Sequence, residues 1–357
     1  MKVVLIGVGQ AGGKVTQALA EFDYEMGFEA VKGAFAVNTA KTDLREIDLD
    51  TMLIGQDRVK GHGVGGDNEL GAEIMQAEAT EVMDGLDQRI TSEVEGVMVV
   101  AGLGGGTGSG GAPALAKELQ RIYDVPIYVL GILPGRDEGS IYQANAGRSL
   151  KTVVREADSA LLIDNDAWRE SGESVEEGYD HINEQIAQRI GLLLASGEAV
   201  EGVAESVVDS SEIINTLREG GIASMGYATA EASEDPEENV NTITSLTRNA
   251  LLTKMSLPDA VEAETALLVI AGDPERVSRK GVEKARKWVE EETGSLQVRG
   301  GDFPLNSDRL GALVLLGGVE RSRRVEEFMD RAREAAENQQ SADPTETFEN
   351  DDLDNLF

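Results

Sequence analysis

A glycine-rich stretch in the first third of the chain constrains the fold more than any other feature. Residues 101–114 read AGLGGGTGSGGAPA, with an apolar run at 97–100 before them and a helix-like segment at 112–123 after them. Glycine lets backbone approach a ligand closely, and a helix N-terminus presents unpaired N–H groups and a partial positive charge. The order of strand, glycine loop and helix therefore predicts a cradle for phosphate rather than a flexible Gly/Ser linker.

A second glycine loop lies at the start of the chain. Residues 2–6 have the pattern of a buried strand, GVGQAGG follows at 7–13, and a helix is expected over 14–22. This G-x-G-x-x-G spacing is also typical of an NAD-binding unit, which needs an acidic residue at the end of the second strand. The expected second strand, 33–37, ends instead in Asn38-Thr39-Ala40, and Asp43 lies beyond it. An NAD-dependent oxidoreductase is therefore a weaker alternative, and it leaves the 104–111 run unexplained.

A third loop, GHGVGGDN at 61–68, lies between a strand expected at 52–55 and a helix expected at 69–86. Three such loops suggest a site that surrounds a polyphosphate, with His62 as an ordinary loop residue. Strands expected at 127–133 and 160–164, with a helix at 140–157 between them, continue the β-α rhythm to residue 165. This rhythm predicts an α/β fold with a parallel, doubly wound, Rossmann-like sheet. The loop PGRDEG at 134–139 would then lie at the ligand-binding end of the sheet.

The middle of the chain combines a long helix with a pair of carboxylates. Apolar residues recur at helical spacing over 179–195, which predicts a long helix that carries Asn183 near its start. Asp209 precedes a helix expected from about Ser210, and Glu212 follows three residues later. That spacing fits a helix cap, and it also fits two carboxylates that polarise a water molecule.

The second half has a different pattern, which predicts a smaller α+β domain. Strands are expected at 226–232, 266–272, 296–303 and 312–318, the last two joined by a turn at 304–308, and helices at 237–252, 277–292 and 321–338. Residues 339–357 form a polar, acidic tail, which we expect to be disordered. Its hydrophobic end could contact a protein partner or simply fray.

Charge and composition exclude several classes of function. Asp and Glu number 66 against 32 Lys and Arg, a net charge of −34, so no basic stripe is available for nucleic acid. The acidic excess is spread along the chain, as in proteins adapted to high salt. The chain has no cysteine and two histidines, which argues against a Cys or His metal site. No apolar run reaches membrane-spanning length and residues 1–7 lack a signal-peptide layout, so we expect a cytoplasmic protein with no membrane insertion.

These motifs resemble those of the tubulin/FtsZ superfamily, and most of all its CetZ group from halophilic archaea. GGGTGSG at 104–110 is similar to the signature loop of the superfamily, and GQAGG at 9–13 to its first nucleotide loop. Asn38-Thr39-Ala40 and Gly65-Gly66-Asp67 are similar to the second and third loops. Val207 and Tyr142 stand where FtsZ-type chains carry Asn and Arg, which is typical of the CetZ type.

The resemblance implies a GTPase domain at 1–176, a central helix at 177–197, a catalytic loop and helix at 198–219, and a C-terminal α+β domain at 220–338. It also implies head-to-tail homopolymers that bind GTP or GDP, with Mg²⁺, and a role in cell shape. It assigns the phosphates to Gln10, Ala11, Gly12, Gly106, Thr107 and Gly108, with Gly13, Lys14, Asn38, Gly65, Gly66, Asp67, Gly104 and Gly105 in the wider nucleotide site. It assigns ribose to Glu138, guanine to Asn165 and Asn183, and hydrolysis of a neighbour's nucleotide to Asp209 and Glu212.

No dedicated metal ligands are implied, because phosphates and water supply most of the oxygens around Mg²⁺. The chain also lacks the G-x-x-x-x-G-K-[ST] pattern of P-loop enzymes. A structural or regulatory subunit that binds GTP and hardly hydrolyses it remains the main alternative.

Overall fold

The computed structural model describes residues 1–86, 89–168, 175–198 and 208–341. Within these ranges the strands are β1 (Val3–Val8), β2 (Val31–Asn38), β3 (Asp50–Leu53), β4 (Gly96–Gly102), β5 (Ile127–Leu133), β6 (Ser159–Asp164), β7 (Ile222–Glu231), β8 (Ala263–Gly272), β9 (Gln297–Pro304) and β10 (Arg309–Val319). The helices are α1 (Gly9–Met26), α2 (Lys41–Leu44), α3 (Gln56–Val59), α4 (Asn68–Asp84), α5 (Gly106–Ile122), α6 (Ser140–Glu156), α7 (Asn165–Trp168), α8 (Val175–Ser196), α9 (Ser210–Leu217), α10 (Asn239–Thr253), α11 (Arg279–Thr293) and α12 (Arg323–Ser341).

The first six strands form the parallel sheet that the β-α rhythm predicts. Their spatial order is β3-β2-β1-β4-β5-β6, and each neighbouring pair is parallel. The order reverses between β1 and β4, and ligands of such sheets bind beyond the carboxyl ends of the strands at this reversal. The first glycine loop follows β1 and the 104–111 run follows β4, so both lie at the predicted place.

The C-terminal strands extend the same sheet, which the sequence did not predict. β7 pairs with β6 in parallel at its first residues, Ile222 beside Ala160. The sheet then continues β7-β10-β8-β9, with β10 antiparallel to both of its neighbours and β9 parallel to β8. The predicted turn at 304–308 thus joins two strands that β8 separates, because the chain crosses over β8 between them.

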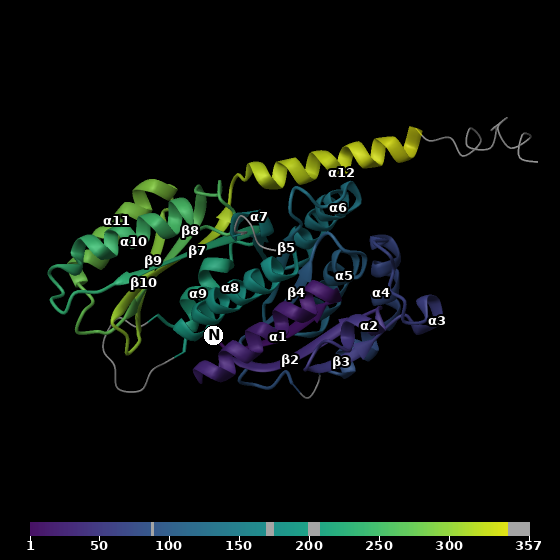
Figure 1. Cartoon of the computed structure of the whole chain (residues 1–357), viewed down its shortest axis with the longest axis horizontal. Coiled ribbons are helices and arrows are strands. Elements are labelled where there is room, and N and C mark those ends of the chain that lie inside the picture. Colours follow the sequence, from purple (N-terminus) through teal and green to yellow (C-terminus); the bar gives the residue numbers. More distant parts are fainter. Residues whose placement is uncertain (87–88, 169–174, 199–207, 342–357) are drawn as a thin grey trace, which may run out of the picture.

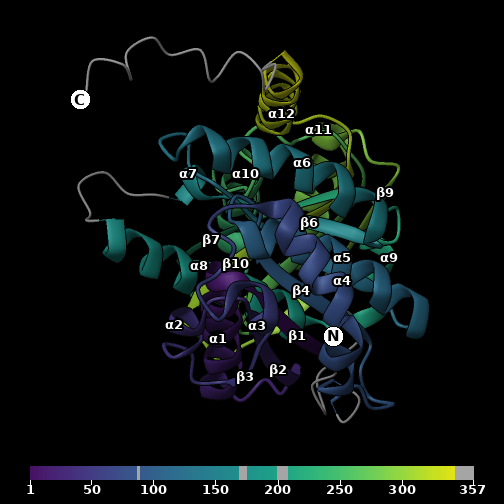
Figure 2. The same ribbon diagram turned by 90° about the vertical axis from the view of Figure 1, so that its right-hand side faces the viewer.

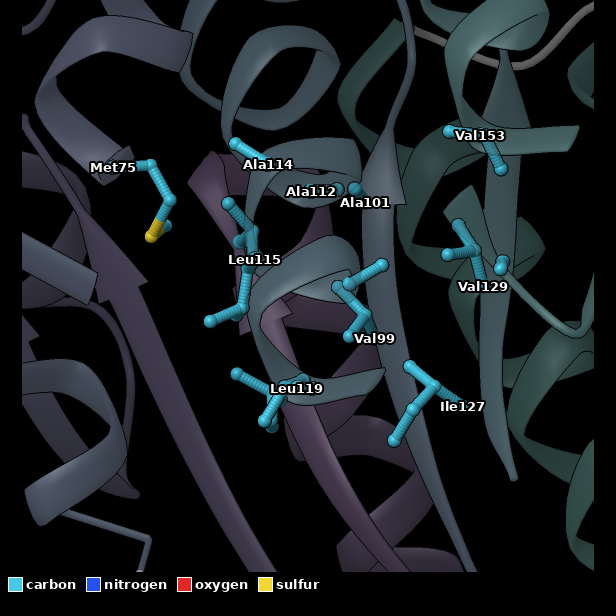
Figure 3. Packing of buried hydrophobic residues seen from close by; sticks show 14 of the residues in the cluster. Met75, Val99, Ala101, Ala112, Ala114, Leu115, Leu119, Ile127, Val129 and Val153 are labelled. Carbon is cyan, nitrogen blue, oxygen red and sulfur yellow. The ribbon is translucent and has the colours of Figure 1, made fainter. Parts of the chain in front are cut away.

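Helices cover both faces of the sheet and enclose three apolar clusters. Alternate residues of β1, β4 and β5 pack against α4, α5 and α6 on one face. Figure 3 shows Leu115 and Leu119 of α5 lying over Val99 of β4 and Ile127 of β5. The other face packs against α1, α8 and α9 in a cluster that continues onto β8 and β10. The buried side chains of Ile186 and Ile190 on α8 therefore belong to a core shared by both halves of the sheet.

The C-terminal half has its own outer layer, formed by α10 and α11 on the remaining face of β8 and β10. Helix α12 then leaves this half and returns to the first one, where it packs on α6 (Figures 1 and 2). A Cβ on Gly147 of α6 would lie 2.2 Å from the carbonyl oxygen of Phe328, which shows how closely the two helices approach.

Several predicted boundaries differ from the structure. α1 begins at Gly9 rather than residue 14 and α5 at Gly106 rather than 112, because the glycines themselves form the first helical turns. The short helices α2, α3 and α7 were not predicted, and α7 begins directly after β6. α12 continues to Ser341, three residues into the predicted tail. The rest of that tail and Val207 lie outside the described residues, and the proposed domain limits stay predictions.

Candidate functional site

The glycine loops after β1 and β4 meet at the reversal point of the sheet. Gly9 has a φ of 76°, which turns the chain from β1 into α1, and a Cβ there would lie 3.0 Å from the backbone nitrogen of Gly108. A Cβ on Gly12 would lie 2.2 Å from the carbonyl oxygen of Val100. Side chains are excluded at these positions because the backbones of α1, β4 and α5 touch one another. This close approach places the N-terminal ends of α1 and α5 next to each other, beyond the neighbouring strands β1 and β4.

Two helix N-termini point their unpaired N–H groups at this region. α5 is preceded by Gly105 and α1 by Val8, and in the described structure no side chain caps either helix. The first backbone bond of α5 runs from the N–H of Ser109 to the oxygen of Gly105, at 3.2 Å. The N–H groups of Gly106, Thr107 and Gly108 precede it, and such groups bind anions with the help of the helix dipole.

The second and third loops are tied to the first turns of α5. The hydroxyl groups of Thr107 and Thr39 are 2.7 Å apart, which joins the signature loop to the loop after β2. Asn145 of α6 donates to the carbonyl oxygens of Gly66, at 2.7 Å, and Gly104, at 3.0 Å. Residues from four segments of the chain are thus brought together. Thr39 and Asn145 were not among the predicted site residues, and their hydrogen bonds depend on tertiary contact.

Some predicted binding residues use their side chains to build the loops. The side-chain oxygen of Asn38 accepts from the N–H of Thr39 at 2.7 Å, and its amide donates to Asp43 at 3.1 Å. Asp67 caps α4 by accepting from the N–H of Leu70 at 3.0 Å. Lys14 lies 3.6 Å from Glu46. Gln10, Ala11 and Gly65 are exposed, while Gly13 is buried in α1.

Polar residues from three elements gather beyond β5 and β6. Glu138 accepts from the N–H of Gly135 at 2.7 Å and from the hydroxyl of Tyr179 at 3.2 Å. Tyr179 and Asn183 are four residues apart on α8, so they lie on the same side of the helix. Asn165 is 8% exposed, and its buried side-chain oxygen has no hydrogen-bond partner within the described structure. Tyr179 was missed by the sequence analysis, although its spacing from Asn183 was a usable signal.

The two carboxylates after α8 lie at the opposite end of the sheet. Asp209 caps α9, accepting from the N–H groups of Ser211 at 2.7 Å and Glu212 at 3.2 Å. The adjacent Ser210 hydroxyl donates to Glu95, just before β4 begins. The glycine cradle follows the other end of β4, whose seven residues span about 20 Å. One subunit therefore cannot place its own carboxylates on a ligand in its own cradle.

The environments of these carboxylates shift their pKa values in opposite directions. The Ser211 hydroxyl and backbone hydrogen bonds lower the pKa of Asp209. Burial and the charge of Asp209 raise the pKa of Glu212, and the positive charge of Arg299 on β9 opposes that rise. Asp209 thus keeps its charge in acid longer than Glu212 does.

Other features of the described residues bear on cofactors and membranes. No three His, Asp or Glu side chains in the described ranges come close enough together to hold a metal ion. A Mg²⁺ ion bound here would take most of its ligands from phosphate and water oxygens, which suits this ion. Among the helices of the described residues, none combines the length and apolarity needed to span a bilayer.

Comparisons with known proteins bear directly on this site. Residues 2–173 match the model of the Tubulin/FtsZ family GTPase domain, and residues 172–334 match that of the tubulin-like CetZ C-terminal domain. The tubulin-like protein CetZ2 of Haloferax volcanii is 67% identical, with all of both chains covered. A solved GTPγS-bound protofilament of Haloferax volcanii CetZ2 has a TM-score of 0.92 at 66% identity, covering 96% of this chain and all of that one. A GDP-bound monomer of CetZ1 from the same organism has a TM-score of 0.87 at 52% identity, covering 94% and 100%.

Proposed function

Because this chain belongs to the Tubulin/FtsZ family, among its tubulin-like CetZ proteins, we propose that it binds GTP and assembles head to tail into cytoskeletal filaments. In this proposal GTP is hydrolysed where two subunits meet. The observation that carries the proposal is the separation between the glycine cradle and the carboxylates of α9 at opposite ends of one sheet. Head-to-tail stacking brings the α9 end of one subunit onto the cradle of the next.

The cradle is suited to the triphosphate. The N–H groups at the start of α5 and α1, in Gly106, Thr107, Gly108, Gln10, Ala11 and Gly12, supply donors without a competing cap. Phosphoryl transfer depends mainly on positioning and on stabilising charge, which fixed backbone donors and helix dipoles provide. Mg²⁺, when bound, supplies further positive charge to the phosphates. Loops carrying Gly65, Gly66, Gly104 and Gly105 close the cradle around them.

The ribose and the base of the nucleotide are assigned to the polar residues that lie beyond β5 and β6. Glu138 accepts the ribose hydroxyls, and Asn165 and Asn183 contact guanine. The partnerless oxygen of Asn165 supports this assignment, because a buried acceptor without a partner is costly and a ligand N–H would satisfy it. Tyr179, which already donates to Glu138, orients that carboxylate.

Hydrolysis is assigned to Asp209 and Glu212 of the neighbouring subunit. Both carboxylates lie at or near the surface of the α9 end, and together they can orient water for attack on the terminal phosphate. Asp209 both caps α9 and fulfils this role. The cap interpretation and the catalytic interpretation of these residues are therefore compatible.

The cellular role follows from the family resemblance alone, which points to control of cell shape in the cytoplasm. The acidic tail at 339–357 is proposed to contact a protein partner. The Tubulin/FtsZ match replaces the NAD-dependent interpretation of the first glycine loop. A GTP-binding subunit with little hydrolysis remains the competing function, and turnover measurements distinguish the two.

The first test measures GTP turnover per subunit against protein concentration in molar KCl with Mg²⁺. We expect a steep rise above a threshold concentration, since sites form only between subunits. Turnover per subunit that is independent of concentration would show a self-contained site, contrary to the proposal. Nucleotide binding without turnover at any concentration would favour the regulatory subunit.

A mixing experiment tests the shared site more directly. Glu212→Ala keeps the cradle and loses the carboxylate, while Thr107→Ala weakens the cradle and keeps the carboxylate. GTP is added at a concentration that loads only an intact cradle. Each variant alone should be nearly inactive, and an equal mixture should recover roughly a quarter of wild-type turnover, because about a quarter of random head-to-tail contacts join two intact parts. No recovery, with filaments present, would contradict hydrolysis in trans.

A further inference from the structure

Arg324, in the first turn of α12, is a buried cation beside the base end of the candidate site. Its side chain is 2% exposed. Its Nε donates to Asp164 Oδ2 at 3.1 Å, and its Nη2 donates to the carbonyl oxygen of Pro134 at 2.8 Å. The same Nη2 lies 3.4 Å from Asp166 Oδ2, and the guanidinium carbon lies 4.3 Å from the centroid of the Phe328 ring. One planar group therefore joins α12 to the ends of both β5 and β6.

The partners of Arg324 frame the residues assigned to sugar and base. Asp164 and Asp166 lie on either side of Asn165 in the chain. Pro134 begins the loop that leads to Glu138, and Asp166 also accepts from the N–H of Arg136 in that loop, at 2.9 Å. Asp166 in turn donates its N–H to Asp164 at 3.2 Å. Arg324 thus holds two loops in a fixed relation without belonging to either of them.

This arrangement needs an arginine rather than a positive charge alone. A guanidinium presents several donors in a rigid plane, and here they reach a carboxylate, a carbonyl and a second carboxylate at once. An ammonium group is a single point of charge and cannot span the same three acceptors. Burial raises the pKa of Asp164 and the charge of Arg324 opposes the rise, so removing the arginine would leave an uncompensated buried carboxylate.

We propose that Arg324 is a positioning residue for the ribose and base of the bound nucleotide, through which docking of α12 on α6 governs nucleotide retention. The inference rests on the proposed function, because it assumes that Glu138 and Asn165 contact the nucleotide. It extends that function by making α12, an element outside the GTPase sheet, part of the nucleotide site. By linkage, a partner that pulls α12 from α6 loosens the nucleotide, and bound nucleotide strengthens the docking of α12.

The proposal predicts different effects on binding at the two ends of the nucleotide. Among the described residues, the hydrogen-bond partners of Arg324 are Asp164, Pro134, Asp166 and Glu327. None of them belongs to the glycine cradle, whose donors come from α1 and α5. Loss of Arg324 should therefore weaken recognition of sugar and base while phosphate binding persists. A general loss of structure would weaken binding at both ends together. Comparing the effect on sugar and base recognition with the effect on phosphate binding therefore distinguishes a positioning role from a general loss of stability.

The test uses the full chain in molar KCl with Mg²⁺ and three variants. Arg324→Lys keeps the charge beside Asp164. The double variant Arg324→Met with Asp164→Asn removes both charges together, so no buried carboxylate is left unpaired. Arg323→Met is the matched control, since Arg323 is in the same helical turn and 83% exposed. Each protein is tested for dissociation of a fluorescent GDP analogue, for affinity for inorganic tripolyphosphate, and for its thermal unfolding temperature.

We expect both Arg324 variants to release the GDP analogue about tenfold faster, because one well-placed buried hydrogen bond is worth about that factor. Tripolyphosphate affinity should stay within about twofold of wild type, and Arg323→Met should match wild type in both assays. Unchanged GDP release in the folded variants would overturn the proposal, as would an equal loss of tripolyphosphate and GDP binding. A wild-type protein that fails to bind GDP would instead refute the proposed function itself.

Discussion

At the scale of single residues, the surroundings of Glu212 determine the direction in which its pKa is shifted. The residue is half-buried in the first turn of α9, with Asp209 before it in the chain and Arg299 across from it on the edge strand. Arg299 lies opposite Leu267 in the β8–β9 register, on the face of the sheet that packs against α9. Its Nη2 donates to Gln297 at 2.8 Å, and its Nη1 is buried with no partner in the described structure. The charge around Glu212, in the proposed catalytic pair, is thus set partly by the C-terminal strands.

This environment predicts a pH dependence. Turnover requires the charged form of Glu212, whose pKa is raised, so activity should fall on acidification at a higher pH than for an ordinary glutamate. Arg299→Gln removes a charge that lowers this pKa, and the acidic limb of the turnover profile should move to higher pH. The measurement is turnover of assembled protein between about pH 5 and about pH 8. Arg309→Gln, at the far end of β10, is the control and should leave the acidic limb of the profile in place. If the acidic limb does not move in Arg299→Gln, Glu212 is not the group whose protonation causes it.

Asp209 allows capping and catalysis to be separated in one residue. Asp209→Ala removes the cap of α9 and should destabilise the protein by about 1 kcal/mol, whereas Asp209→Asn keeps a capping oxygen and should unfold close to wild type. Both variants lose the carboxylate, so both should lose most turnover within filaments. Denaturant midpoints and turnover above the assembly threshold provide the comparison. Full activity in Asp209→Asn would mean that the residue acts only as a cap.

At the scale of elements, the glycines of α5 have two distinct tasks. Those at its start are proposed to present N–H groups to phosphate, while Gly110 lets α4 approach α5. A Cβ on Gly110 would lie 1.9 Å from the carbonyl oxygen of Asn68, whereas one on Gly105 would meet nothing within 4 Å. The same run in the sequence therefore contains both closely packed and open glycine positions.

A pair of alanine substitutions tests this division. Gly110→Ala should destabilise the nucleotide-free protein by about 1–3 kcal/mol, because a backbone oxygen of α4 must move to admit the methyl group. Gly105→Ala should leave stability nearly unchanged, as its position is open and its φ of −71° suits any residue. Denaturant unfolding in molar KCl provides the measurement. Equal stability of the two variants would argue against the close approach of α4 and α5.

At the scale of the whole molecule, a single sheet carries both ends of the proposed filament contact. The N-terminal strands lead to the cradle, while the strands after β7 pack against α8 and α9. The shared core along α8 joins the two halves of the sheet, and α12 joins these halves a second time by packing on α6. Contacts made at the α9 end therefore have a continuous packed route through α8 to the first glycine loop, proposed to bind nucleotide.

Net charge acts on the same scale. With a charge of −34, mutual repulsion opposes the compact state, and it opposes contact between identical subunits as well. Screening distances fall from about 10 Å at 0.1 M salt to about 3 Å at 1 M. We expect the unfolding temperature and the extent of assembly both to rise with KCl over this range and beyond. Unfolding followed by circular dichroism, with assembly followed by sedimentation, tests this; equal stability in dilute buffer would contradict adaptation to high salt.

Much of the architecture was predictable because it follows from local patterns. The buried strands, the parallel order implied by the β-α rhythm and the helix at 210 each depend on a few neighbouring residues, and the structure confirms them. The three glycine loops predicted a phosphate cradle for the same reason, and that assignment stays a prediction. Helix starts at Gly9 and Gly106 were missed, because glycine disfavours helices in isolation and only the surrounding backbone makes those turns stable.

The remaining features depend on contacts between distant segments. The pairing of β6 with β7, the return of α12 to α6, and the bonds from Asn145 and Arg324 to the loops join residues separated by more than 35 positions, so no local pattern encodes them. The proposed phosphate cradle was predictable from short motifs, because its donors are backbone groups within one helical turn. The distance between cradle and carboxylates arises because α9 packs beside the start of β4, while the cradle follows its other end. That placement depends on tertiary contacts between distant segments, so only the folded structure decides it.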